Sequence, residues 1–497
     1  MSAERARLVE EALRTGTLSG LPDGHFIAGR FVASASGRRM ESFDPGRGVA
    51  FASVAAGDAE DVDRAVEAAR AALSGPWAGL SPAARGEILM RASQLIAERA
   101  ARFAVVETLD SGKRLAEAEG DVSGVVRAFA YYAGAADKLH GDSMPLGPDH
   151  VGLTIEEPVG VAAQIVPWNY PLSTAARGIA PALAVGCTLV VKPAEQTPFT
   201  TLMLAELLHE AGLPEGVLNV VAGTGAEAGA ALVAHPGIDH ITFTGSVATG
   251  QRVMRAAAEH VTRLALELGG KSPVVVMADC DLDAAFAGVM EAIFENAGQI
   301  CSAGSRLIVE EAIAQPLLDR LVAGAEALRP GHGLSDAGIG PINSPAQLAR
   351  VADHVERARA AGNRILTGGG IVPPEACGGG WFYRPTIALA RGADDPLVQE
   401  EIFGPVLTVQ VVPDFEAAVT AANATSYALV AGIYTRDHAR AWRFARAVDA
   451  GQVYINEFFA GGVAMPFGGN RKSGFGRAKG MAGLRSYSKL KSVVARI

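Results

Sequence analysis

The stretch Ile238-Asp-His-Ile-Thr-Phe-Thr-Gly-Ser246 reads as a buried strand that continues directly into the start of a helix. The pattern predicts a strand from Ile238 to Phe243, a tight loop at Thr244-Gly245-Ser246 and a helix from Ala248 to Glu259. This succession of strand, loop and helix is typical of a parallel α/β sheet. Ligands of such sheets bind beyond the carboxyl ends of the strands, where these loops lie.

The same succession recurs on both sides of this stretch. Upstream, strands are expected over 161–166, 188–191 and 217–221, with a helix over 198–211. Downstream, strands are expected over 272–277, 305–309, 406–412 and 430–434, with a helix over 282–296. Because the second series begins near Leu268, we expect the boundary between two domains near Glu267–Gly270.

The length of 497 residues favours more than one hydrophobic core, since single cores stop growing at roughly 250–300 residues. The net charge is -9, and no basic stripe runs along the chain, so nucleic acid is not an expected partner. The basic residues near the C-terminus are loosely spaced among glycines and are interpreted as solvated loop charges. They are Arg471, Lys472, Arg477 and Lys479.

The cysteine pattern and the apolar stretches exclude several classes of protein. Four cysteines without close spacing do not form a disulfide framework, and no Cys/His cluster predicts a metal site. The N-terminal residues 1–16 lack the apolar core of a signal peptide. The most apolar stretch, 179–191, is shorter than the roughly 20 residues that cross a bilayer. We therefore expect no membrane partner and a cytoplasmic location.

Cys301 lies in the glycine-flanked segment Asn296-Ala-Gly-Gln-Ile-Cys-Ser-Ala-Gly-Ser-Arg306. Glycines on both sides let backbone N–H groups approach a reacting atom closely, and such groups lower a thiol pKa or hold an oxyanion. The alternative is a buried structural cysteine, an interpretation that suits Cys187 with its apolar neighbours better.

Two further polar residues stand in settings that favour chemistry. Glu267 ends an apolar strand against a glycine pair, where partial desolvation would raise its pKa towards that of a general base. An ion pair with Lys271 or Arg263 remains the alternative. Asn169 stands in a turn between two prolines, and its amide either donates to a developing oxyanion or serves the turn alone.

Seven motifs follow one another in the chain, and none of them is specific alone. They are Pro167-Trp168-Asn169-Tyr170-Pro171, Lys192-Pro193-Ala194-Glu195, Phe243-Thr244-Gly245-Ser246 with Gly250, Glu267-Leu268-Gly269-Gly270-Lys271, Gly298-Gln299-Ile300-Cys301, Glu400-Glu401-Ile402-Phe403-Gly404-Pro405 and Pro466-Phe467-Gly468-Gly469. In this order, over nearly the whole chain, they resemble the motifs of the aldehyde dehydrogenase superfamily. The resemblance is to the NAD(P)-dependent branch that hydrolyses its thioester.

The resemblance implies catalytic roles. Cys301 matches the nucleophile, Glu267 the base that activates the hydrolytic water, and Asn169 with the Cys301 N–H the oxyanion hole. The implied reaction oxidises an aldehyde to the carboxylic acid through a thiohemiacetal and a thioester on Cys301. Relatives that pass the acyl group to coenzyme A or phosphate generally lack a glutamate at this position. A non-catalytic relative would lack Cys301 or Glu267, and both are present.

The resemblance also implies a dinucleotide site, although the chain has no GxGxxG fingerprint there. Lys192 and Glu195 match residues that hold the adenosine ribose, and Glu401 and Phe403 match those that position the nicotinamide ribose and ring. Because Glu195 would repel a 2′-phosphate, we expect NAD rather than NADP. The full set of expected coenzyme residues is Val166, Pro167, Trp168, Lys192, Glu195, Gly225, Phe243, Gly245, Ser246, Gly250, Leu268, Glu401 and Phe403.

Three aromatic residues match positions around the aldehyde in the family: Tyr170, Phe458 and Phe467. Phe467 also suits an ordinary core position. Ala478 stands where relatives often carry a glutamate, so any proton relay that uses this glutamate is absent here.

Two departures from the family bear on the charge of the substrate. Arg177 stands where many broad-specificity members have tryptophan, and succinate semialdehyde dehydrogenases are similar there and use the arginine for a distal carboxylate. Their second arginine, six residues before the nucleophile, is Glu295 in this chain. Arg177 therefore either binds substrate or pairs with Glu295. We expect a polar aldehyde, either a carboxylated semialdehyde or an amino or betaine aldehyde.

The fold that the resemblance implies is α/β with three parts: a Rossmann-like coenzyme domain, an α/β catalytic domain and a small β bridging element. We expect residues 1–136 and 158–266 in the coenzyme domain, 267–485 in the catalytic domain, and 137–157 with 486–497 in the bridging element. A β arm leaves a sheet edge that another subunit can cover, so we expect a homodimer or homotetramer.

Overall fold

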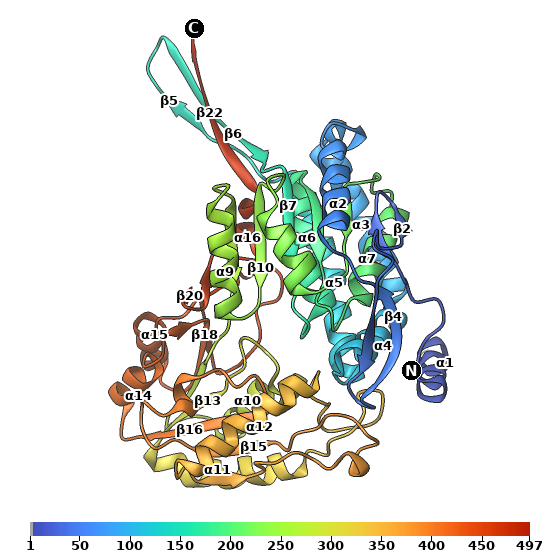
Figure 1. Ribbon diagram of the computed structural model, residues 1–497. Helices are drawn as coiled ribbons and strands as arrows, with labels where there is room; N and C mark the ends of the chain where they lie inside the picture. The colour runs from blue at the N-terminus through green and yellow to red at the C-terminus, as the bar shows by residue number, and fades with distance from the viewer. Residues whose placement is uncertain (1–2) are drawn as a thin grey trace.

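The computed structural model describes residues 3–497 and is built around two large parallel sheets (Figure 1). The first sheet has eight strands. In order across the sheet they are β2 (Arg30–Val32), β1 (His25–Ile27), β9 (Leu218–Val220), β8 (Thr188–Lys192), β7 (Val161–Ile165), β10 (His240–Thr244), β11 (Arg263–Glu267) and β21 (Gly474–Phe475). The five strands from β9 to β11 are parallel, and both edges of the sheet carry antiparallel strands.

Helices cover both faces of the first sheet because successive side chains along its strands point to opposite faces and are apolar on both. Val161 and Ala163 of β7 pack on one face, with α2 (Ala59–Ala72), α8 (Ala230–Ala234) and α9 (Val247–Ala258). Ala162 of the same strand packs on the other face, which belongs to a larger core. The helices of that core are α1 (Ala3–Thr15), α3 (Pro82–Glu98), α4 (Ala100–Ser111), α5 (Leu115–Ala135), α6 (Pro171–Val185) and α7 (Phe199–Glu210).

The second sheet has seven strands and lies below the first in Figure 1. In order they are β14 (Ile365–Thr367), β15 (Thr386–Leu389), β16 (Val406–Val412), β13 (Arg306–Glu310), β12 (Pro273–Val276), β18 (Val430–Tyr434) and β19 (Gln452–Ile455). Val274 and Val275 of β12 point into two different cores, on opposite faces of the sheet. The accompanying helices are α10 (Leu282–Phe294), α11 (Glu311–Ala327), α12 (Pro345–Ala360), α13 (Pro396–Gln399), α14 (Phe415–Ala422) and α15 (His438–Ala447).

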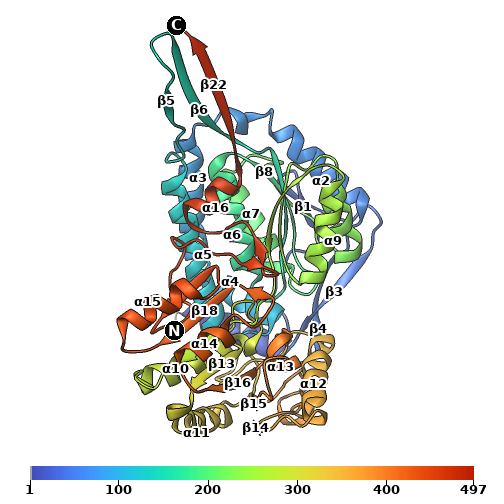
Figure 2. The ribbon, with the colours of Figure 1, turned by 90° about the vertical axis from the view of Figure 1, so that its left-hand side faces the viewer.

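A three-stranded arm projects away from both sheets (Figure 2). It consists of β5 (Ser143–Pro145), β6 (His150–Pro158) and β22 (Ser488–Arg496), and the last two pair from Ser488 opposite Pro158 to Arg496 opposite His150. Short elements complete the chain: the hairpin β3 (Arg39–Asp44) and β4 (Val49–Ala55), the pair β17 (Tyr427–Ala428) and β20 (Asn470–Arg471), and α16 (Gly480–Ser486).

The structure confirms the expected α/β class, and each of the expected strands is present within a few residues of its predicted bounds. One helix differs from the prediction: α10 ends at Phe294 rather than at Asn296, because Asn296 and Ala297 adopt left-handed backbone conformations. The segment after β9 forms a short π-helix over Gly225–Gly229 that continues into α8. The division into three domains stays a prediction. Within residues 3–497, no helix combines the length and the apolar character needed to cross a membrane.

Candidate active site

The segment that leads to Cys301 is held in an unfavourable backbone conformation. Asn296 and Ala297 have φ angles of 47° and 52°, and Gly298 follows at 70°. Left-handed conformations of residues other than glycine cost about 1–3 kcal/mol each and persist only where the surroundings enforce them. A side chain at Gly298 would overlap the Gly404 carbonyl, which explains the glycine.

Hydrogen bonds from three elements enforce this turn. Glu117 of α5 accepts from the Asn296 N–H at 3.0 Å. The Gln299 side chain donates to the Asn296 carbonyl at 3.0 Å and accepts from the Asn343 N–H at 2.9 Å. The turn is thus tied to both halves of the molecule, and Cys301 follows it at a fixed position.

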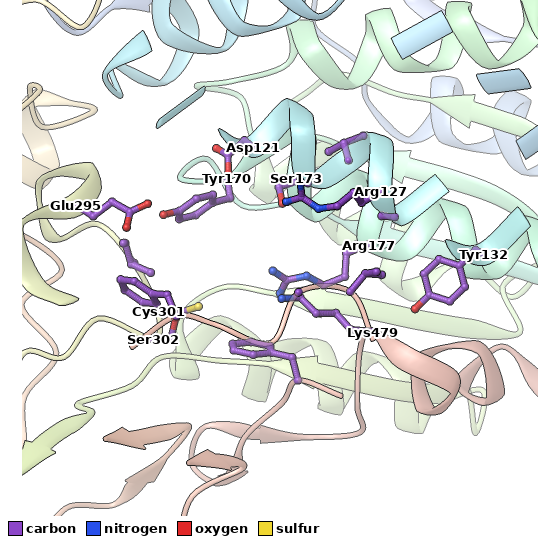
Figure 3. Close-up of a pocket in the computed structure, with 18 of the residues that line it drawn as sticks. Asp121, Arg127, Tyr132, Tyr170, Ser173, Arg177, Glu295, Cys301, Ser302 and Lys479 are labelled. Carbon is purple, nitrogen blue, oxygen red and sulfur yellow. The ribbon is translucent and has the colours of Figure 1, made fainter. Parts of the chain in front are cut away.

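Cys301 faces a cavity of about 300 Å³ that is lined by α5, the start of α6, the Cys301 loop, the segment from Tyr454 to Val463, Phe467 and Lys479 (Figure 3). Burial raises the pKa of the Cys301 thiol to about 11, and Glu267 and Glu401 add to this effect. Arg177 opposes it and is the largest influence that favours the thiolate.

Asn169 follows strand β7 and is buried, with its amide directed at the Cys301 loop. Its Nδ2 donates to the Gln299 carbonyl at 2.8 Å, and its own carbonyl accepts from Asn296 at 3.2 Å. A carboxamide carries two N–H donors, so one remains for a further acceptor. Within residues 3–497, the Cys301 N–H also makes no hydrogen bond. Two donors near the sulfur are thus available.

Glu267 is the last residue of β11 and is buried, and its Oε2 has no hydrogen-bond partner within residues 3–497. Burial raises the pKa of this carboxyl to about 8, against the attraction of Arg177, Arg477 and Lys479. Neither of the ion pairs considered for it is formed. Arg263 donates to the Ser488 carbonyl at 2.6 Å instead.

Cys301 and Glu267 do not line the same cavity. Glu267 lines a neighbouring cavity of about 20 Å³, bounded also by Thr244 and Ala478. Arg177 lines both cavities, and it is the largest influence that favours the ionised form of both groups. The thiol and the carboxyl thus share one cation.

Lys479 is a site residue that the sequence analysis missed. We had interpreted it as a solvated loop charge, but it lines the Cys301 cavity, and burial together with Arg177 lowers the pKa of its amine to about 8. Phe467 and Ala478 exchange two backbone hydrogen bonds of 2.8 Å, which brings Lys479 beside the Phe467 ring. The pairing of Phe467 with Ala478, which are not neighbours in the sequence, turns the Lys479 side chain towards the cavity.

The backbone at Lys479 is strained, with φ 61° and ψ 168°, a region in which glycine is the usual residue. The neighbouring residues enforce it. Gly480 donates to the Val463 carbonyl at 2.7 Å, and its own carbonyl accepts from the Tyr132 hydroxyl at 3.2 Å. Lys479 thus stands where the backbone favours glycine, which indicates that the lysine side chain has a function.

The opposite wall of the cavity carries carboxyl groups, shown with Tyr170 in Figure 3. Asp121 forms an ion pair with the fully buried Lys113, whose amine also lies 4.0 Å from the centre of the Tyr170 ring. Glu295 has no ion pair within residues 3–497, and burial and neighbouring carboxylates raise its pKa to about 7. Arg177 and Glu295 thus line one cavity without pairing with each other.

The aromatic lining differs in part from the expectation. Tyr170 and Phe467 line the cavity, but Phe458 does not. The Phe458 ring is buried in the core between Tyr454 and Phe459, with both ring centres 5.0 Å away, and these two neighbours reach the cavity in its place.

The expected coenzyme residues gather at the carboxyl ends of the parallel strands. Lys192 ends β8, and its buried amine bonds to Glu195 at 3.2 Å, while the Lys192 carbonyl accepts from Val166 at 3.0 Å. Ser246 caps the N-terminus of the twelve-residue helix α9, an arrangement that favours anions. A Cβ atom placed on Gly225 would meet no atom of the described residues within 4 Å. These residues fit the ribose and phosphates of a dinucleotide.

The other expected coenzyme residues lie along the same edge. Phe243 and Gly245 flank the end of β10, and a side chain at Gly250 would lie 2.6 Å from Leu268. The rings of Trp168, which follows Pro167, and Phe403 meet edge to face at 5.3 Å.

Glu401 is half-buried near this edge and accepts from the Gly270 N–H at 2.9 Å. Burial raises its pKa to about 7 and lowers that of Lys271 to about 7, and the Lys271 amine has no hydrogen-bond partner within residues 3–497. The ion pair between Lys271 and Glu267, the alternative interpretation of Glu267, is not formed.

Comparisons with known proteins agree on one family. The model of the aldehyde dehydrogenase family matches residues 31–493. A betaine aldehyde dehydrogenase of Bacillus subtilis is 41% identical over 472 residues, which cover 94% of this chain and 96% of that protein. The aldehyde dehydrogenase of Bacillus cereus, solved in complex with NAD+, has a TM-score of 0.95 at 38% identity and covers 100% of this chain and 99% of its own. A mutant P. syringae indole-3-acetaldehyde dehydrogenase in complex with NAD+ and IAA has a TM-score of 0.96 at 38% identity, with 99% of each chain covered.

The charges around Cys301 predict opposite effects of two substitutions on its titration. Glu267→Gln removes a carboxylate and should lower the pKa of Cys301, whereas Arg177→Met removes the main attraction and should raise it. Below its pKa, a thiol reacts in proportion to its thiolate fraction, which changes tenfold for each pH unit. At pH 8, iodoacetamide should therefore label Cys301 faster in the first variant than in the wild type, and more slowly in the second. The labelling rate is measured by mass spectrometry as a function of pH. If the profiles of the variants coincide with that of the wild type, this electrostatic account is wrong.

Proposed function

The chain belongs to the aldehyde dehydrogenase family, and we propose that it oxidises a polar aldehyde to the carboxylic acid through a thioester on Cys301, with NAD as the coenzyme. One observation carries the proposal: Cys301 and Arg177 line one cavity beside the coenzyme edge, and the Asn169 amide and the Cys301 N–H each keep an unused donor at the Cys301 loop. NAD, when bound, accepts the hydride of the aldehyde carbon.

The residues of this chain then act in two stages. In the first stage, Arg177 favours the Cys301 thiolate, which attacks the aldehyde carbon, and the carbonyl oxygen becomes an oxyanion. Asn169 Nδ2 and the Cys301 N–H are the donors we assign to this oxygen. In the second stage, Glu267 takes a proton from the water that attacks the thioester carbon, and the sulfur leaves as the thiolate.

The environment of Glu267 suits a base in the second stage. With a pKa of about 8, the carboxyl is largely protonated at neutral pH, and a thiolate formed at Cys301 opposes its ionisation further. Acylation removes the charge of the sulfur, and the carboxyl then ionises more readily because Glu267 and Cys301 each oppose the ionisation of the other. The small cavity of Glu267 has room for a single water beside Arg177.

We also propose that the chain assembles into a homo-oligomer through the β arm. Strand β22 is the edge of a three-stranded sheet, and the arm exposes many large apolar side chains. They are Leu146, Val151, Leu153, Ile155, Leu490, Val493 and Val494. An exposed apolar edge of this kind is stabilised when another subunit covers it.

A first prediction tests the roles of Glu267 and Cys301 together. Glu267→Gln cannot take a proton from water, so hydrolysis should slow more than hydride transfer, and an acyl adduct should accumulate on Cys301. Quenching after mixing with NAD and aldehyde, followed by mass spectrometry, measures the adduct. Cys301→Ala is the matched control, which should show neither adduct nor oxidation while still binding NAD. Wild-type steady-state rates in either variant would refute the assigned role.

A second prediction concerns the choice between NAD and NADP. Glu195 accepts hydrogen bonds from a ribose hydroxyl but repels a 2′-phosphate, and a charge-assisted hydrogen bond contributes roughly 1.5–3 kcal/mol. We therefore expect a preference of roughly tenfold to hundredfold for NAD in kcat/KM. Glu195→Gln should reduce the ratio, mostly by improving NADP. Equal kcat/KM values for the two coenzymes in the wild type would contradict the assignment.

A third prediction tests the arm. Leu490 and Val494 are 61% and 65% exposed and lie four positions apart on one face of β22. Replacing both by Lys places charges on the proposed interface and should reduce the mass measured by light scattering to that of a monomer. Met254→Lys, at an exposed apolar position on α9, is the control and should leave the assembly intact. A monomeric wild type, or an arm variant that keeps the wild-type mass, would exclude assembly through the arm.

A further inference from the structure

Three cations line the Cys301 cavity, and within residues 3–497 none of them forms an ion pair. Arg127 is exposed and bonds to Ser123 at 2.7 Å, whereas Arg177 and Lys479 lie together beside Phe467. The Arg177 guanidinium lies 5.0 Å and the Lys479 amine 5.3 Å from the centre of the Phe467 ring, and Figure 3 shows the nitrogen ends of both side chains pointing into the same part of the cavity. Within residues 3–497, neither side chain forms an ion pair, and the proximity of Arg177 contributes to the lowered pKa of Lys479. Two like charges placed together in a partly buried cavity are stabilised by an anion between them.

The carboxyl groups of the opposite wall do not supply this anion. Asp121 is already paired with Lys113, which also contacts Glu107 at 3.6 Å. Glu295 stands among carboxylates, and its raised pKa makes it partly neutral near pH 7. The unbalanced charge of the cavity is therefore positive, and it lies on the side of Cys301.

The catalytic thiolate alone does not account for both cations. Arg177 lines the cavities of both Cys301 and Glu267 and is the largest influence that favours the thiolate. Cys301 and Glu267 raise the pKa of Lys479, but burial and Arg177 lower it more, so these two acids do not balance the second cation. The strained backbone of Lys479 is maintained by bonds from Gly480 and Tyr132. Strain of this kind indicates a local function, and a second cation beside Arg177 supplies one.

We propose that Arg177 and Lys479 together bind a carboxylate of the substrate, so that the protein acts on a short aldehyde with a carboxylate at its other end. This inference rests on the proposed function of the site. The planar fork of Arg177 suits a carboxylate in a bidentate geometry, and Lys479 adds a point charge from a different element of the fold. The cavity of about 300 Å³ fits a small substrate.

The test compares two aldehydes of nearly equal size, 4-oxobutanoate and its uncharged methyl ester. The quantity measured is the selectivity, the ratio of kcat/KM for the acid to kcat/KM for the ester. We expect the wild type to favour the acid by tenfold or more, and Lys479→Met to reduce this ratio on the order of tenfold, chiefly through KM. Lys479→Arg keeps the positive charge and should therefore retain most of the selectivity for the acid. Lys472→Met, at an exposed lysine seven positions away, is the control and should keep the wild-type ratio.

A binding measurement separates this inference from the proposed function. Succinate has the carboxylate without the aldehyde, and it should slow the labelling of Cys301 by iodoacetamide in the wild type and in Lys472→Met, but far less in Lys479→Met. Protection by succinate without oxidation of any aldehyde would overturn the proposed function and leave the anion site standing. Oxidation of both aldehydes without protection by succinate would overturn the anion site alone.

Three further results would also overturn the inference. The first is an unchanged selectivity in Lys479→Met. The second is an equal loss for acid and ester together with a raised pKa of Cys301, which would mean that Lys479 serves the thiolate. The third is a wild-type preference for a trimethylammonium aldehyde over 4-oxobutanoate, which would mean that Glu295 sets the charge of the substrate. Because the ester and the thermal unfolding of each variant are measured in parallel, a misfolded variant is recognised as such.

Discussion

The guanidinium of Arg177 acts on two acids that burial keeps neutral. Desolvation raises the pKa of Cys301 to about 11 and that of Glu267 to about 8, and for both groups Arg177 is the largest influence in the opposite direction. The two acids also oppose the ionisation of each other, so they favour losing their protons in turn rather than together. A reaction that needs first a thiolate and then a carboxylate base suits this coupling. The position of Arg177, fixed by α6 and the Phe467 ring, therefore affects both stages.

The fold brings these groups together by ending its strands at one place. Glu267 ends β11, Asn169 follows β7, and Cys301 follows a turn between the two large sheets. The turn includes two left-handed residues, each of which costs about 1–3 kcal/mol. Bonds from α5 and from Asn343 hold it, so the cost is offset by contacts distant along the chain. The nucleophile is positioned by the packing of the sheets rather than by its local sequence.

Sequence reasoning was able to predict what depends on local pattern. The parallel strands, their carboxyl ends and the motifs around Cys301, Glu267 and Asn169 follow from periodicity, turn residues and family resemblance. The inward side chain of Lys479 could not be predicted, because it depends on the pairing of Phe467 with Ala478 and on a backbone that disfavours lysine. Other features depend on tertiary contacts in the same way.

Among these features, Phe459 rather than Phe458 reaches the cavity, and Asp121 enters it from α5, a helix with no motif of its own. A strained residue other than glycine beside a matched motif is the kind of position where sequence reasoning fails and function is found.

The same reasoning limits what the 41% identity to a betaine aldehyde dehydrogenase says about substrate. Fold and mechanism depend on the shared strand ends, but the charge of the substrate depends on a few side chains of one cavity. In this chain, two unpaired cations stand beside the thiol, while the opposing carboxyl groups are either paired or partly protonated. A cationic substrate would have to place its charge near Arg177 and Lys479 or displace a proton from Glu295, whereas a carboxylate relieves the repulsion between Arg177 and Lys479.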